Sequence, residues 1–349
     1  MNKIFHPVIQ TIYLLLLLAF STVNAQNFEK IDKHALDAPK GIQNNIEKLT
    51  HYLTEPAKTD LEKVRAFYVW IANNIEYDVK QFFSSVIPTD EITATDVLKS
   101  RKSVCQGYSV LLKSMCEIAG ISCFIVPGYS KGYGWNPKRK FTTSDHAWNV
   151  VKINGEWKLL DATWGSGYLN DNSKFEKQFE EKFFLSSPET LIYSHLPSNP
   201  MWQLLECPVT IEEFKKDSSE LKTIVENKGY CFNYKDSIAR FEALNPDEQQ
   251  LQSALSAYRF NPELIDDVGF AYLNYAYEKT KLLLAENGGL SNQEKYDLQK
   301  EVLELYEISR DFFKKSSSSI SKNALEVVNE NIKNSQHNLE VFKKILETQ

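Results

Sequence analysis

The sequence predicts an α+β domain, in which a helix that begins at a cysteine packs on an antiparallel sheet, followed by an all-α domain. Apolar residues recur at helical spacing directly after Cys105. Two strand-like segments, 145–153 and 156–164, flank Asn154-Gly155, the strongest two-residue signal for a β-hairpin. The C-terminal part of the chain has a helical pattern with clear capping residues.

The N-terminal residues 1–25 have the pattern of a secretory signal peptide. Lys3 precedes an apolar run, and Val23-Asn24-Ala25 fits a cleavage site before Gln26. The apolar run is too short to cross a bilayer comfortably. We therefore expect an exported protein, periplasmic or extracellular, with no stable membrane span after cleavage.

The charge of the chain argues against nucleic acid as a partner. The formal net charge is −6, and lysines and acidic residues are interspersed rather than gathered into a basic patch. This pattern is typical of an ordinary solvated surface.

Two helices are expected before the cysteine. Residues 46–53 form a short amphipathic pattern, and Thr59 with Glu62 forms a capping box that opens a second helix. We expect this second helix to end near Tyr77. Residues 79–92 have the composition of a loop, and Thr93 or Thr95 caps a turn that leads to Cys105.

Cys105 is the candidate nucleophile. It lies in the first turn of the predicted helix, which ends at Gly120. Unpaired backbone N–H groups and the helix dipole stabilise a thiolate there, and the same N–H groups can face an oxyanion. The competing interpretation is a small buried apolar side chain, as for most free cysteines.

The predicted hairpin brings a histidine and an aspartate together. The two-residue loop pairs Ile153 with Glu156, which places His146 opposite Thr163 and Trp148 opposite Asp161. His146 and Asp161 are then diagonal neighbours on one face, about 7–8 Å apart at the backbone. A cysteine, a histidine and an aspartate in this relation form a nucleophilic triad.

The segments around the hairpin supply candidate walls for a cleft. Residues 122–129 are strand-like, and the loop 130–144 directly before His146 is placed to act as a lid or a substrate wall. Trp148 shares the predicted face of His146 and is the best supporting residue. Trp164 is a further candidate, with core filling as the alternative for each tryptophan.

These motifs resemble the transglutaminase-like cysteine-protease superfamily, and within it the branch of the kyphoscoliosis peptidase and its bacterial relatives. The resemblance covers residues 60–165 and continues more weakly through the segments around Phe183, His195 and Trp202. It implies a papain-like arrangement of helix against antiparallel sheet and acyl transfer from amides through a thioester. It places the catalytic residues on Cys105, His146 and Asp161. The candidate supporting residues of the cleft are Trp148, Gln106, Trp164 and Tyr77.

The domain organisation follows from the change of pattern near residue 207. We expect a transglutaminase-like domain over 26–206, with its core at 60–165, and an α-helical domain over 207–349. Asn245-Pro246 and Asn261-Pro262 have the pattern of helix starts. The helical domain either recruits a protein partner or only packs against the first domain.

No cofactor and no metal ion is expected. The chain has no CxxC or HExxH pattern, and the histidines other than His146 are scattered along it. Export would permit disulfides among the four other cysteines; Cys116–Cys123 and Cys207–Cys231 are conceivable pairs, and buried free thiols are the alternative.

The sequence therefore predicts an exported thiol enzyme whose substrate is a protein or peptide amide. A peptidase or amidase is the leading interpretation, and cross-linking or deamidation of the transglutaminase type is an alternative, because both use the same thioester. A non-catalytic binding or scaffold protein with this fold is the third possibility. The residues identify no particular substrate.

Overall fold

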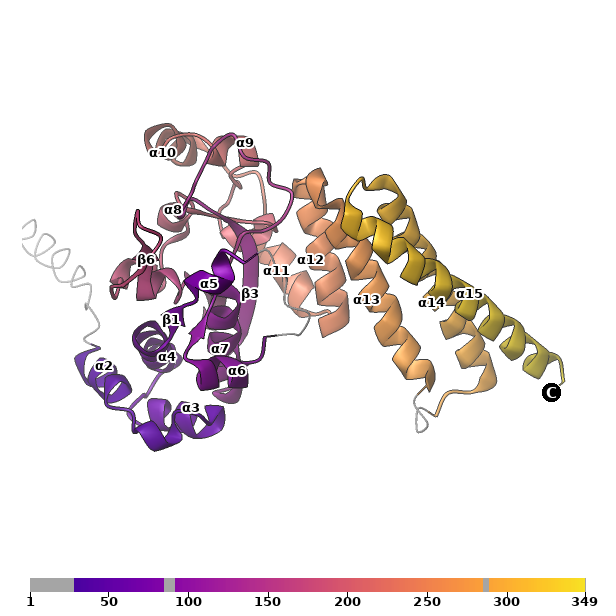
Figure 1. The fold of residues 1–349 in the computed structure, drawn as a ribbon, viewed down its shortest axis with the longest axis horizontal. Coiled ribbons are helices and arrows are strands. Elements are labelled where there is room, and N and C mark those ends of the chain that lie inside the picture. The colour runs from indigo at the N-terminus through magenta and orange to yellow at the C-terminus, as the bar shows by residue number, and fades with distance from the viewer. Residues whose placement is uncertain (1–27, 85–91, 285–288, 349) are drawn as a thin grey trace, which may run out of the picture.

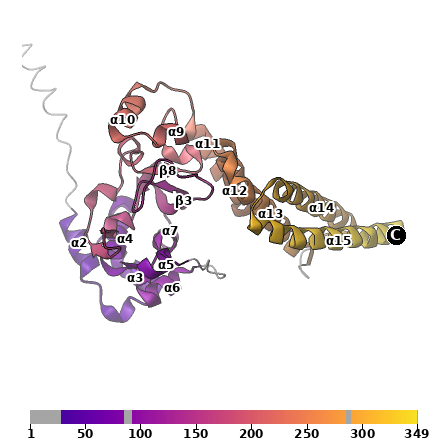
Figure 2. The ribbon, with the colours of Figure 1, turned by 45° about the horizontal axis from the view of Figure 1, so that its top comes forward.

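The computed structural model describes residues 28–84, 92–284 and 289–348. The predicted signal peptide, residues 1–25, lies outside the described residues. A body of helices around a sheet forms one part of the molecule, and a long helical bundle extends away from it (Figures 1 and 2). Within the described ranges no helix combines the length and the apolar character needed to cross a bilayer.

The elements up to the cysteine helix are mostly helical: α2 (Glu29–Leu36), η1 (Lys40–Ile42), α3 (Ile46–Thr54), α4 (Asp60–Asn74), β1 (Glu76–Tyr77), α5 (Val79–Phe82), α6 (Ala94–Ser100), β2 (Lys102–Ser103) and α7 (Cys105–Ile118). The region that follows carries most of the strands: β3 (Cys123–Ser130), β4 (His146–Ile153), β5 (Glu156–Leu160), η2 (Trp164–Ser166), β6 (Gly167–Leu169), β7 (Phe175–Lys177), η3 (Glu181–Phe183), α8 (Pro188–Leu191), β8 (His195–Pro197) and η4 (Pro200–Gln203). The rest is helical: α9 (Ile211–Phe214), α10 (Ser218–Asn227), α11 (Tyr234–Glu242), α12 (Pro246–Phe260), η5 (Pro262–Leu264), α13 (Ile265–Leu284), α14 (Asn292–Lys315) and α15 (Ser319–Glu347).

The main sheet is antiparallel and has the strand order β5-β4-β3-β8. Helix α7 packs on β3 and β4, which confirms the predicted fold class. Leu111, Leu112 and Met115 of α7 are fully buried in the same core as Val150 and Leu160 of the sheet. The interface between α7 and the sheet is mainly apolar, and its burial holds the helix against the strands.

The hairpin register is the predicted one over the length of β5. Asn154 and Gly155 have φ values of 52° and 81°, and the ladder runs from Ile153 opposite Glu156 to Asn149 opposite Leu160. The second strand ends at Leu160, however, not at residue 164. Since the ladder stops there, the predicted pairs of His146 with Thr163 and of Trp148 with Asp161 do not form.

The strand ends early because a side chain takes over the hydrogen bonds of the next backbone groups. Oδ1 of Asp161 accepts the backbone N–H groups of Thr163 (2.7 Å) and Trp164 (3.0 Å). This local turn competes with the ladder, and the chain continues into η2. Asp161 is therefore anchored at the tip of the strand.

The helix starts agree well with the capping residues. Thr59 and Glu62 form a capping box at the start of α4, and Thr93 with Asp96 forms another at α6. Helix α4 ends at Asn74 rather than near Tyr77, because Glu76 and Tyr77 pair in parallel with β2. The predicted loop 79–92 also contains the short helix α5, which Asp78 caps.

The apolar core of the sheet does not end at residue 207. Phe241 of α11 contacts Phe124 of β3 and Trp202 of η4, with ring centroids 5.3 and 5.7 Å apart. Phe214 of α9 is buried in a second cluster with Tyr129 of β3. A disulfide joins Cys207 to Cys231 in this region, whereas Cys105, Cys116 and Cys123 are free.

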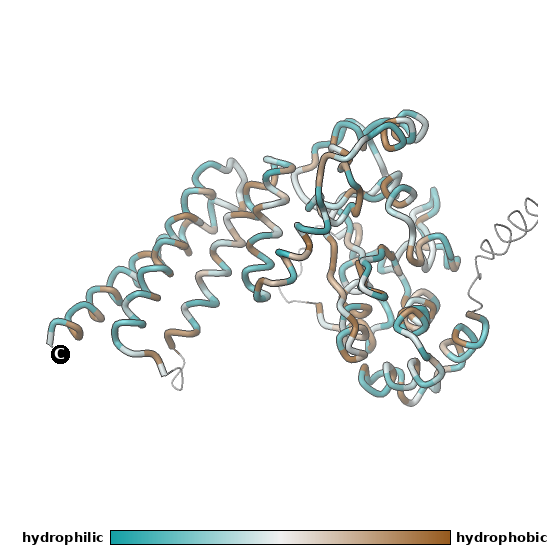
Figure 3. Tube along the Cα trace, turned by 180° about the vertical axis from the view of Figure 1, so that it is seen from behind, coloured by the Kyte–Doolittle hydropathy of each residue, from teal (hydrophilic) through white to brown (hydrophobic). Residues whose placement is uncertain are grey.

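The bundle beyond this point has its own core. Its buried side chains, among them Ala276, Tyr306, Phe313 and Val328, come from α13, α14 and α15. Apolar residues recur in short stretches along these helices and alternate with hydrophilic ones (Figure 3). This periodicity is typical of amphipathic helices that pack along one side.

One buried asparagine connects the start of the bundle to the sheet domain. The Asn261 side chain, between α12 and η5, donates to the Tyr129 hydroxyl (2.7 Å) and to the Phe141 carbonyl (2.6 Å). Tyr129 is the last residue but one of β3, and Phe141 belongs to the long loop before β4. The bundle is thus hydrogen-bonded to the loop that precedes His146.

Candidate active site

The candidate nucleophile lies at the start of α7. Cys105 is the first residue of the helix and is half-buried, so its sulfur lies beside the unpaired N–H groups of the first turn. Gly107 lets this turn approach β2. A Cβ at Gly107 would lie 2.0 Å from Oγ of Ser103, and the sequence therefore needs glycine two residues after the cysteine.

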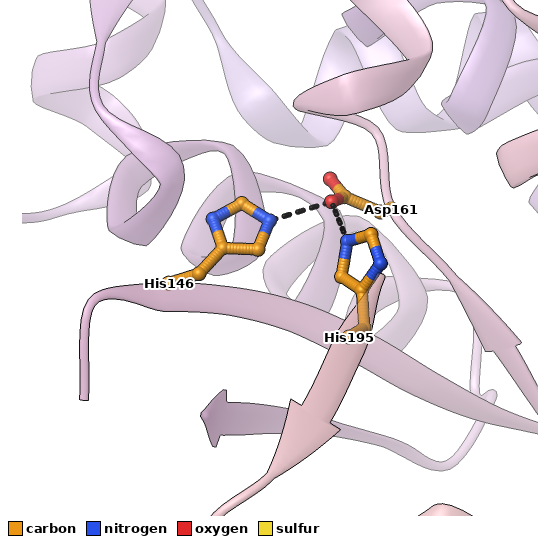
Figure 4. Close-up of side chains that lie close together, drawn as sticks. All are labelled: His146, Asp161 and His195. Carbon is orange, nitrogen blue, oxygen red and sulfur yellow. Dashed lines mark hydrogen bonds and ion pairs between the residues drawn. The ribbon is translucent and has the colours of Figure 1, made fainter. Parts of the chain in front are cut away.

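His146, the first residue of β4, faces both the cysteine and the aspartate. Its Nε2 lies 2.6 Å from Oδ2 of Asp161 (Figure 4). Because Nε2 faces a carboxylate it carries the ring proton, which leaves Nδ1 as the base. The Cys105 thiol lies beside the same imidazole and raises its pKa.

The electrostatics of the pair favour a charged imidazole. Burial lowers the pKa of His146, but the charge and the hydrogen bond of Asp161 outweigh burial, and the hydrogen bond of Cys105 adds to them, so the pKa is raised. Burial alone would raise the pKa of Asp161; the two imidazoles that donate to it hold that pKa well below its ordinary value. An ionised Asp161 and a protonated His146 are the expected states beside a thiolate.

A second histidine, His195, also hydrogen-bonds to the carboxylate of Asp161. His195, from β8 at the edge of the sheet, is fully buried and places Nε2 3.0 Å from the same Oδ2 of Asp161 (Figure 4). Its Nδ1 lies 2.8 Å from Oγ of Ser194. Asp161 thus accepts four hydrogen bonds, two from backbone N–H groups and two from imidazoles, which fills all its lone-pair positions.

The sequence analysis did not assign His195 to the site. The residue is 34 positions from Asp161 and reaches it only because β8 pairs with the far edge of β3. Its one signal in the sequence was its place in the segment that resembles the extension after the catalytic core.

His146, Asp161 and His195 also form a group whose possible ligand atoms all lie within 4.8 Å of one another. The distances of 2.6 and 3.0 Å between the imidazoles and the carboxylate are those of hydrogen bonds. Two ligands on a tetrahedral zinc ion, each about 2.0–2.2 Å from it, lie roughly 3.3 Å apart. We therefore assign hydrogen bonds here, and independence from metal stays a prediction.

A cavity of about 430 Å³ opens beside His146. Two of the four predicted supporting residues, Tyr77 and Trp164, line it. Trp148 is buried and lies behind His146, with ring centroids 5.7 Å apart, so it supports the imidazole from the core rather than forming the wall of the cleft. Gln106 is exposed and is not among the lining residues.

The loop 130–144 forms one wall of the cavity through Gly132, Tyr133 and Arg139. Several contacts hold it in place besides the hydrogen bond from Asn261 to the Phe141 carbonyl. Oδ1 of Asp145 accepts the backbone N–H of Ser130 (2.8 Å), Arg139 pairs with Asp145, and the Tyr133 hydroxyl hydrogen-bonds to Ser173 (2.7 Å). The loop is therefore a fixed wall in this structure.

The sequence matches known proteins over the region that carries this site. The profile of the transglutaminase-like superfamily matches residues 47–162. Kyphoscoliosis peptidase from Homo sapiens is 38% identical over 60% of this chain and 31% of its own length. Hillarin from Drosophila melanogaster is 30% identical over 54% of this chain and 24% of its own length.

The chain therefore spans a third or less of the length of these curated relatives. A solved structure of a TGase aligns with 50% of this chain and 41% of its own, at 16% identity and a TM-score of 0.28. That structural similarity is too low to support an argument about the site.

Proposed function

We propose, from the match of residues 47–162 to the transglutaminase-like superfamily, that this chain is an exported thiol enzyme that acts on amides of proteins or peptides. Cys105 is the nucleophile, His146 the general base and acid, and Asp161 the residue that orients His146. One observation carries the proposal. A half-buried thiol at a helix start lies beside an imidazole that a fully buried carboxylate holds by a hydrogen bond.

In the first step the Cys105 thiolate, whose proton is already held on Nδ1 of His146, attacks the carbonyl carbon of the amide. N–H groups of the first turn of α7 face the oxygen that becomes negative. The C–N bond then breaks, and His146 returns the proton to the leaving amine. The products of this step are a free amine and a thioester on Cys105.

In the second step an acceptor attacks the thioester while His146 removes its proton, and the C–S bond breaks to return the Cys105 thiolate. Water as the acceptor gives hydrolysis, and an amine gives a new amide. We favour hydrolysis, because a relative with 38% identity carries the name of a peptidase. Transamidation is the alternative, since its first step is the same.

Export is part of the proposal. The Cys207–Cys231 disulfide supports it, because such bonds persist in oxidising compartments. The predicted signal peptide at 1–25 points the same way. A protein partner of the helical region remains a separate prediction.

The test is alkylation of the mature protein by iodoacetamide across pH, with the label located by mass spectrometry. We expect Cys105 to be labelled at neutral pH, well below the pKa of about 8.5 of a free thiol. His146→Ala should slow this labelling, whereas His34→Ala, at a histidine that stacks on Tyr52 away from the site, should not. Cys116 should stay unlabelled, since its hydrogen bond to Cys123 and its burial raise its pKa.

If Cys105 is labelled slowly, and at the same rate in the wild type and in His146→Ala, the enzyme hypothesis is excluded and a non-catalytic scaffold is favoured. If Cys105 is activated, the acceptor is decided next. A casein substrate with added dansyl-cadaverine releases new amino termini under hydrolysis and gains fluorescence under transamidation.

A further inference from the structure

Aromatic side chains form much of the lining of the cavity beside His146. Its lining includes Tyr77, Phe82, Tyr133, Trp164, Tyr168, Phe175 and Phe183. They come from segments far apart in sequence: β1 and α5, the loop 130–144, and the region between β5 and β8 that contains η2, β6, β7 and η3. The fold thus brings these aromatic side chains together around one cavity, which His146, the candidate general base, also lines.

Several of these rings are exposed to solvent. The exposed fractions are 39% for Phe82, 44% for Tyr133 and 52% for Tyr168. Tyr133 and Phe82 contact each other edge to face, 6.4 Å apart, and Phe82 in turn lies 5.8 Å from Tyr77. A contiguous exposed apolar patch beside a cavity is typical of a binding site.

The charged side chains of the wall are already engaged. Arg139 pairs with Asp145, and Lys182 lies 3.4 Å from Glu180. Nζ of Lys131 donates to the Lys216 carbonyl at 2.8 Å. Each cation in the lining therefore has a partner within the chain, and a charged side chain of a substrate would have to displace one of them.

We propose that this cavity binds a large apolar side chain, aromatic by preference, on the residue next to the scissile amide. The inference rests on the proposed function and names its substrate class. The cavity of about 430 Å³ lies within the size range of ligand pockets. His146 lines the cavity, and the Cys105 thiol lies beside the same imidazole, so a side chain held in the cavity brings its own amide close to His146 and, through it, to Cys105.

The expected selectivity follows from desolvation. A ring that leaves water for this cavity also covers Phe82 and Tyr133, whereas a lysine or glutamate must lose hydration without gaining a free counter-charge. Even small apolar differences in a pocket change rates about tenfold. We therefore expect a preference of at least about tenfold for phenylalanine over lysine at this position.

The test uses two matched pairs of thiol reagents. Bromoacetyl-phenylalanine amide and bromoacetyl-lysine amide place the side chain on the amine side of the reacting carbon. The chloromethyl ketones of acetyl-phenylalanine and acetyl-lysine place it on the acyl side. Each rate of Cys105 labelling is divided by the iodoacetamide rate of the same variant, so that a change in intrinsic thiol reactivity cancels.

The proposal expects the phenylalanine reagent to be preferred in at least one pair. The double variant Phe82→Ala/Tyr133→Ala should reduce that preference severalfold. Tyr277→Ala, which removes a tyrosine that is 54% exposed on α13, should leave the preference unchanged. Equal rates in both pairs, or a preference that survives the double variant, would overturn the proposal.

A second measurement separates the pocket from the chemistry. Saturation-transfer NMR with Cys105→Ala reports binding of acetyl-phenylalanine methylamide and acetyl-lysine methylamide without any reaction. Saturation transfer from the protein to the phenyl ring should be seen with Cys105→Ala and should disappear when Phe82→Ala and Tyr133→Ala are added. This result supports the pocket even if Cys105 proves unreactive. Absence of transfer to the phenyl ring overturns it, even if Cys105 is activated.

Discussion

Nε2 of His195 and Oδ2 of Asp161 lie 3.0 Å apart, with both side chains fully buried. The same oxygen accepts from His146 at 2.6 Å, so two imidazoles share one carboxylate oxygen. Burial lowers the pKa of His195 more than Asp161 raises it. His195 is therefore neutral, and the negative charge of Asp161 remains available to a protonated His146.

We predict that the hydrogen bond from His195 to Asp161 keeps the proton between His146 and Asp161 on the imidazole of His146. Without its N–H, Asp161 becomes the stronger base and competes for the proton that balances the thiolate. His195→Leu should lower the rate of Cys105 alkylation at pH 7 by about tenfold, which corresponds to roughly one pKa unit. His195→Gln, whose amide can donate to Asp161, should restore most of the rate. Equal pH profiles for the wild type and His195→Leu would contradict a positioning role.

A second prediction concerns stability in acid. Asp161 has a lowered pKa in the folded protein, so its ionised form contributes stability above the ordinary aspartate pKa of about 4. That contribution is lost as the pH falls from there through the lower folded value. Asp161→Asn should therefore lose stability at pH 6 and lose less on acidification than the wild type. Urea unfolding at pH 6 and pH 3 measures this, with exposed Asp171→Asn as the control.

Gly107 provides a third prediction. Its added Cβ would lie 2.0 Å from Ser103 Oγ and 2.8 Å from Cγ2 of Val97, so Gly107→Ala should destabilise the protein by about 1–3 kcal/mol. Gly41→Ala is the matched control, because a Cβ at Gly41 meets nothing within 4 Å. Urea unfolding of the two variants compares them directly. Equal stability would mean that α7 can move away from β2 at no cost.

The link between the bundle and the loop gives a fourth prediction. Asn261→Leu leaves the Phe141 carbonyl and the Tyr129 hydroxyl without their partner, at a cost of about 1–3 kcal/mol. The expected readout is faster proteolytic cleavage within 130–144, found by mass spectrometry of the fragments. Asn245→Ala, at an exposed helix cap, should not change the cleavage at this loop. Unchanged cleavage in Asn261→Leu would show that the loop is held by its other contacts alone.

Local chemistry accounts for what the sequence predicted well. Asn154-Gly155 set the hairpin register, and capping residues such as Thr59 and Asn245 marked helix starts. These signals work because a turn or a cap is decided by a few adjacent residues. They were enough to bring His146 and Asp161 to one end of the sheet.

What the sequence did not predict depends on contacts between distant segments. His195 joins the site through the pairing of β8 with β3, and Trp148 lies behind His146 because the sheet core covers it. The predicted change of domain at residue 207 followed the change in secondary structure. The apolar core is not divided at that residue, because Phe214 and Phe241 from the helical region pack with side chains of the sheet.

The state of the five cysteines makes this chain suited to a chemical screen in intact cells. Cys207 and Cys231 are joined, and Cys116 and Cys123 are buried, so Cys105 is the accessible free thiol. In this chain, a broad thiol-reactive probe would therefore label Cys105 alone, and no other cysteine would have to be replaced first. A compound that protects this position from the probe would identify itself as a ligand of the cleft, before any natural substrate is known.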